Sequence, residues 1–160
     1  MRRSLWLKRL AVVLVFAAII APATVSSQPR TGVLPQPRTG LGLGVMLGQP
    51  SGISAIMWLG GGNAIDAVAA WSFLGGGSLY LHADYQFHAA ADRPLTFYTG
   101  LGGFVQFADD PEIGFRVPLG ISYLFEQAPF DIFAEIGPSM ALIPETRFLL
   151  NGGIGFRIYF

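Results

Sequence analysis

From Leu41 to the C-terminus, hydrophobic and polar residues alternate with a period of two. This is the period of a β-strand, in which successive side chains point to opposite faces. Breaks rich in Gly, Pro, Asn and Asp separate the alternating segments and are typical of turns. The pattern predicts eight strands, at residues 41–48, 52–59, 65–73, 79–88, 95–107, 113–125, 130–142 and 147–160. Short turns make consecutive strands antiparallel neighbours, and eight such strands can close into an up-and-down barrel without an open edge.

The two faces of the predicted strands differ in charge. One face carries every charge inside a strand, at Asp66, Asp84, Arg116, Asp131, Glu135, Arg147 and Arg157. Two kinds of barrel fit this pattern. A soluble, lipocalin-like carrier would turn the apolar face inward, whereas a membrane barrel would turn it toward lipid.

Composition favours the membrane barrel. Charged residues make up 12% of the chain, against about 25% in a typical soluble domain. The only lysine is Lys8, and Gly dominates the polar face, where it suits a narrow lumen. We therefore predict an all-β fold, an eight-stranded antiparallel up-and-down transmembrane β-barrel. Its lumen would be filled by side chains, because eight strands leave no room for a general pore.

Inside such a barrel, charged side chains need partners of opposite charge. Arg116, Arg157 and Arg147 can pair with the strand acids. The predicted structural lumen charge network comprises Asp66, His82, Asp84, Arg116, Asp131, Glu135 and Arg157. On the apolar face, aromatic residues gather near strand ends, as in the interfacial girdle of a membrane barrel. They are Trp71, Phe73, Phe87, Phe97, Phe107, Phe115, Tyr123, Phe125, Phe130, Phe148 and Phe160.

The N-terminal region has the features of export. Basic residues precede an apolar stretch at 10–21, and a small-x-small cleavage pattern follows, so residues 1–23 are expected to be a signal peptide. Residues 24–39 are a flexible, Pro-containing linker in which QPRTG at 28–32 recurs at 36–40. The barrel then covers 40–160. The exported part holds six Arg and ten acids, a formal charge of 6 − 10 = −4, and does not resemble a nucleic-acid-binding surface.

Few residues suggest chemistry. Ser72, His82 and Asp84 could form a hydrolytic triad, but a structural network in the lumen is the favoured interpretation. His82 and His88 are roughly 20 Å apart along one strand and cannot share a metal. The absence of Cys excludes a disulfide scaffold and a thiolate zinc site. We therefore expect no catalytic, cofactor-binding or metal-binding residues and no cofactor.

Several segments resemble a family of small, uncharacterised outer-membrane β-barrels first noticed in Borrelia and similar to the OmpA and OmpX transmembrane barrels. The resemblance covers about residues 40–160. It is carried by residues 42–52 (GLGVMLGQPSG), 64–73 (AIDAVAAWSF), 79–85 (LYLHADY), 116–125 (RVPLGISYLF) and 150–160 (LNGGIGFRIYF). It implies an eight-stranded barrel in the outer membrane and no catalytic residues to carry over.

The last strand is also similar to the outer-membrane assembly signal. Gly155, Ile158 and Phe160 fit that pattern, whereas Gly153 occupies the usual polar position. The expected partners are outer-membrane lipid, the barrel-assembly machinery and an extracellular or host protein of unknown identity. The expected function is a non-enzymatic structural or surface-interaction role in the bacterial outer membrane. A lipid-modifying barrel enzyme and a soluble carrier of apolar ligands are the alternatives.

Overall fold

The protein is described by a computed structural model for residues 40–72, 78–90, 94–125 and 128–160. The predicted signal peptide and linker lie outside the described residues. The described chain forms nine strands: β1 (Gly40–Gln49), β2 (Gly52–Gly60), β3 (Asn63–Ser72), β4 (Ser78–Ala90), β5 (Leu95–Phe107), β6 (Glu112–Arg116), β7 (Leu119–Leu124), β8 (Phe130–Ile143) and β9 (Arg147–Tyr159). Within these residues, no helix combines the length and the apolar character needed to cross a bilayer.

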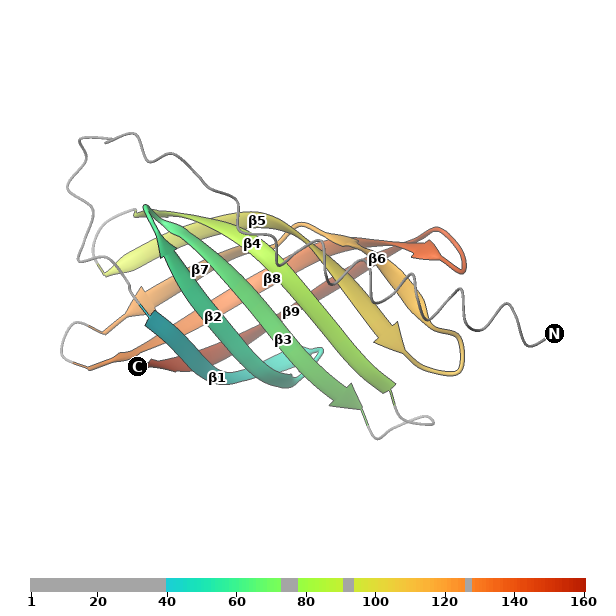
Figure 1. Ribbon diagram of the computed structural model, residues 1–160, viewed down its shortest axis with the longest axis horizontal. Helices are drawn as coiled ribbons and strands as arrows, with labels where there is room; N and C mark the ends of the chain where they lie inside the picture. The colour runs from blue at the N-terminus through green and yellow to red at the C-terminus, as the bar shows by residue number, and fades with distance from the viewer. Residues whose placement is uncertain (1–39, 73–77, 91–93, 126–127) are drawn as a thin grey trace. The chain divides into compact units, whose positions relative to one another are not determined.

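The strands form one antiparallel sheet that closes on itself (Figure 1). Consecutive strands pair from β1 to β5, and β8 pairs with β9. Closure comes from β1, which pairs with β9 from Gly42 opposite Tyr159 to Gln49 opposite Gly152. Because β6 and β7 both lie between β5 and β8, the nine strands occupy eight positions in the ring. The predicted all-β antiparallel fold is confirmed.

The strand predicted at 113–125 is interrupted, so that prediction was wrong in detail. It divides into β6 and β7 at Val117 and Pro118. Pro118 has no N–H to donate to a ladder. Pro138 lies across from the break on β8, and the N–H of Val117 donates to its carbonyl at 2.9 Å. On either side of the break, Arg116 lies opposite Ser139 and Leu119 opposite Ile136, so the register continues through it.

The barrel wall separates side chains by polarity. No charged residue lies on the outward-facing positions of the described strands. Large apolar side chains are exposed there on every strand, for example Leu47, Ile53, Leu101, Ile136 and Ile154, and outward Val105 is a buried exception. The inward-facing positions hold the buried polar residues Ser54, Asp66, His82, Asp84, Gln86, Arg116, Ser122, Asp131, Glu135, Ser139 and Arg157.

Candidate functional site

The interior of the barrel is the candidate site, because it gathers charged and histidine side chains from five strands. The structure places there all seven residues of the predicted lumen network: Asp66, His82, Asp84, Arg116, Asp131, Glu135 and Arg157. Arg116 and Arg157 are the largest fully buried side chains among the described residues. Strand alternation puts them there, since each belongs to the inward-facing set of its strand.

Arg157, on β9, is held by partners on three sides. Its Nε donates to Ser54 Oγ at 2.8 Å, and its Nη2 donates to Asp66 Oδ2 at 2.5 Å. The guanidinium also lies 3.8 Å from the ring centroid of Phe133, in cation–π contact. Gly44 is the residue of β1 between Arg157 and Ser54 in the ladder, and a Cβ added there would meet the backbone of Phe156 and Arg157.

Arg116, on β6, organises a second group of contacts. Its Nη2 donates to Glu135 Oε1, and the other oxygen of Glu135 accepts a hydrogen bond of 3.0 Å from the Tyr98 hydroxyl. Its Nη1 lies against both ring nitrogens of His82, 2.8 Å from Nε2. A Cβ added to Gly137 would meet the guanidinium, so this glycine makes room for the arginine.

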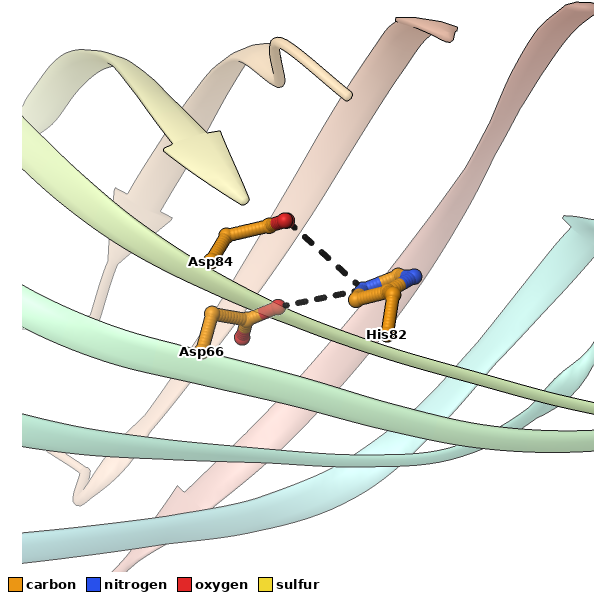
Figure 2. Close-up of side chains that lie close together, drawn as sticks. All are labelled: Asp66, His82 and Asp84. Atoms are coloured by element: carbon orange, nitrogen blue, oxygen red, sulfur yellow. Dashed lines mark ion pairs between the residues drawn. The ribbon is translucent and has the colours of Figure 1, made fainter. Parts of the chain in front are cut away.

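Asp66, His82 and Asp84 lie together between the two arginines, on β3 and β4 (Figure 2). His82 Nε2 is 3.7 Å from Asp66 Oδ1 and 3.8 Å from Asp84 Oδ2, and Figure 2 shows both carboxylates directed at the same imidazole nitrogen. Asp66 and Asp84 are direct cross-strand partners. Such like-charged pairs destabilise a sheet unless a cation lies between or beside them.

Asp84 has the least complete set of partners in this group. Its side chain is fully buried, and neither carboxylate oxygen accepts a hydrogen bond. The nearest cation is Arg116, whose Nη1 is 3.6 Å away. Gly102, the cross-strand neighbour on β5, leaves the space that the carboxylate occupies. Asp84 is therefore buried in an ion pair with Arg116 but without a hydrogen bond to either of its oxygens.

Acids outnumber bases in the described interior. Four buried carboxylates, at Asp66, Asp84, Asp131 and Glu135, face two buried guanidinium groups, at Arg116 and Arg157. With His82 neutral, the formal charge is 2 − 4 = −2. The shortage of positive charge is clearest at Arg116, whose single guanidinium is shared by Asp84 and Glu135.

Several placements differ from the sequence prediction or add to it. Arg147 lies at the barrel rim with its side chain 58% exposed, and it pairs with Glu112 and not with a lumen acid. The sequence did not show this, because strand parity gives the face on which a residue lies but not its depth in the barrel. The prediction missed three hydroxyl groups that complete the network, those of Ser54, Tyr98 and Tyr159. Tyr159 donates to Asp131 at 2.6 Å. All three lie at inward-facing positions, so strand parity was the sequence feature that could have assigned them to the interior.

The remaining predicted residues are placed as follows. Gly155 faces inward, where an added Cβ would meet the ring of Phe133, whereas Ile158 and Phe160 are exposed on the outer face. The side chain of Ser72, proposed as a nucleophile beside His82 and Asp84, lies outside what the structure describes, as does Phe73. Comparisons with protein-family models, with curated proteins and with solved structures each find no match to this chain.

Proposed function

We propose that this chain is an outer-membrane β-barrel with a structural or surface-interaction role and without enzymatic activity. The observation that carries the proposal is the inverted distribution of polarity across the barrel wall. The buried side chains include four carboxylates and two guanidinium groups, while the side chains at the outward-facing positions of the described strands are uncharged and mostly apolar. A soluble surface of this kind would leave a large apolar area in water, whereas lipid makes it favourable.

Exposed aromatic residues support a membrane position because they gather near both ends of the barrel. At the end that holds the C-terminus, these residues are Phe87, Phe97, Tyr123 and Phe160. At the opposite end they are Trp71, Phe107, Phe115 and Phe148. Between them, the exposed side chains are mainly aliphatic, as at Leu101, Ile136 and Ile154. Two aromatic belts around an aliphatic band are typical of a barrel that meets two lipid–water interfaces.

Strand length also agrees with a bilayer. A tilted membrane strand needs about 9–11 residues. The uninterrupted strands range from 9 residues in β2 to 14 in β8. Short segments such as Pro50–Ser51 and residues 144–146 join them at one end.

The contents of the barrel favour a structural role over transport of an apolar ligand. A lipocalin-like carrier needs an apolar cavity, but here the centre is occupied by ion pairs and hydrogen bonds that link Arg116 to Glu135 and Arg157 to Asp66. The first contact ties the neighbouring strands β6 and β8, and the second links β9 to β3 across the interior of the ring. The proposed role is therefore that of a rigid wall whose loops and outer face meet the surroundings.

Cell fractionation combined with gel mobility tests this proposal. We expect the protein in the outer-membrane fraction, extractable only with detergent, and with a gel mobility that changes on boiling because the closed barrel resists dodecyl sulfate. Recovery in the soluble periplasmic fraction would contradict the membrane proposal and favour the carrier. A change in lipid A mass on expression, abolished by His82→Ala, would contradict the non-enzymatic role.

A further inference from the structure

We propose that Asp66, His82 and Asp84 bind one divalent metal ion inside the barrel, with Zn²⁺ as the ion whose chemistry fits best. The proposal departs from the expectation of no metal-binding residues drawn from the sequence. It rests on the geometry of the interior, which holds whether or not the barrel spans a membrane.

The three side chains converge at metal-site distances. One ligand atom from each lies within 4.8 Å of the others, and Nε2 of His82 is 3.7 and 3.8 Å from the two carboxylates. Zn²⁺ binds nitrogen and oxygen at about 2.0–2.2 Å with tetrahedral geometry, so two of its ligands lie roughly 3.3–3.6 Å apart. The His82 distances are too long for hydrogen bonds and are within a few tenths of an ångström of that ligand spacing, so small side-chain shifts bring the three groups onto one ion. Figure 2 shows the two carboxylates meeting at this nitrogen.

The environment of Asp84 favours cation binding independently of these distances. Its carboxylate is fully buried, both oxygens lack a hydrogen-bond donor, and it is directed at His82. Asp66 differs, because its Oδ2 is already bound by Arg157 while its Oδ1 faces His82. Asp66 therefore turns Oδ1 toward the imidazole, and Asp84 turns Oδ2 toward it, with Nη1 of the ion-paired Arg116 3.6 Å from that Asp84 oxygen.

Charge balance gives a further argument. Asp84 and Glu135 share one guanidinium, that of Arg116, so a cation beside Asp84 would offset a local excess of negative charge. An ion at this position also lies between Asp66 and Asp84, the two carboxylates that face each other across β3 and β4. It would convert a repulsive cross-strand pair into a bridged one.

Arg116 is the group that opposes metal binding, since its Nη1 touches the imidazole and approaches Asp84. Binding requires this nitrogen to turn away from His82, so that the neutral imidazole, with its proton on Nδ1, presents the Nε2 lone pair to the metal. Glu135 offers the arginine an alternative, because it already accepts from Nη2. The arginine then keeps a carboxylate partner while Asp84 passes to the metal.

An imidazole and two carboxylates form a set of hard and borderline ligands that suits Zn²⁺, and Co²⁺ can replace it as a spectroscopic probe. The test uses the full chain, unfolded in urea with EDTA and refolded in detergent with Zn²⁺ or Co²⁺ alone, because the filled lumen restricts entry to the folded barrel. We expect one metal ion per chain after gel filtration and visible Co²⁺ absorption that Zn²⁺ removes.

Variants separate the site from adventitious binding. His82→Gln and Asp84→Asn are expected to weaken binding at least about tenfold. The control is His88→Gln on the same strand, which removes the second histidine of the chain and should retain the metal. Equal loss in this control, or a wild-type chain that binds no more metal than Asp84→Asn, would overturn the proposal. Should the variants fail to refold, the wild-type Co²⁺ spectrum decides it. A metal-binding protein found in the soluble fraction would contradict the membrane proposal and leave this one intact.

Discussion

The two faces of β9 show how differently one strand can be used. Its outward residues Ile154, Phe156 and Ile158 are exposed, and Ile154 retains 63% of its surface. Its inward residue Arg157 is 1% exposed and binds Ser54 and Asp66. In a soluble domain these environments would be reversed. The comparison teaches that the apolar side chains of this strand face the medium outside the barrel. The interior is held together by polar contacts.

The largest expected effect comes from breaking the inner face. Arg157→Met removes the donor to Ser54 and Asp66 and raises the excess of buried negative charge. Breaking a buried ion pair by removing one partner costs about 3–5 kcal/mol. We expect a loss of this size in the free energy of unfolding, measured by urea titration of the barrel in lipid vesicles. A loss below about 1 kcal/mol would contradict the interior network as a source of stability.

The next effect tests the outer face. Ile154→Arg places a charge in the middle of the aliphatic band, where it should cost about 2–4 kcal/mol of unfolding free energy in a bilayer. Ile154→Val is the matched control and should cost no more than about 1.5 kcal/mol in the same titration. If Ile154→Arg were neutral or stabilising, the outer face would be in water.

A smaller effect is expected from substituting a glycine that leaves space for a neighbouring side chain inside the barrel. A Cβ at Gly120 would meet the ring of Tyr98, whose hydroxyl donates to Glu135. Gly120→Ala should therefore cost about 1–3 kcal/mol through overpacking. The matched control is Gly103→Ala on the outer face, where the nearest atom lies at an ordinary 3.6 Å. Thermal unfolding of both variants in detergent compares the two faces, and equal shifts would contradict the close packing of the interior.

The smallest effect is expected at the rim. Arg147 pairs with Glu112, but its side chain is largely exposed, and such pairs contribute about 0.2–1 kcal/mol. Arg147→Met is thus the counterpart of Arg157→Met, with the same change of side chain at a different depth. Urea titrations of the two variants should differ by at least about 2 kcal/mol. Similar losses would mean that depth in the barrel does not control the strength of these ion pairs.

The sequence predicted the fold and the faces because both follow from a period of two. Once Asp84 or Arg157 is assigned to one face, every second residue follows it. The depth of each residue in the barrel and its contact partners could not be predicted in the same way, since both depend on the register between strands. That Asp66 faces Asp84, or that Arg147 lies at the rim, emerges only when the turn lengths and the β1–β9 closure are known.

The interruption between β6 and β7 has a different origin. Pro118 was visible in the sequence, but its effect depends on Pro138 lying across from the break on β8. Neither proline can donate to the ladder, so the two together open a gap that one alone need not produce. Likewise, the hydroxyls of Tyr98 and Ser54 gain their roles from partners 37 and 103 residues away in the chain.

Spin labelling along β9 tests the orientation of the barrel wall most directly. The chain has no cysteine, so single substitutions at Ile154, Phe156, Asn151 and Tyr159 can each carry one label. In lipid vesicles, we predict that labels at Ile154 and Phe156 collide frequently with oxygen and rarely with a water-soluble nickel chelate. Labels at the inward positions Asn151 and Tyr159 should collide less with oxygen. Greater access of the nickel chelate than of oxygen at Ile154 and Phe156 would contradict the account.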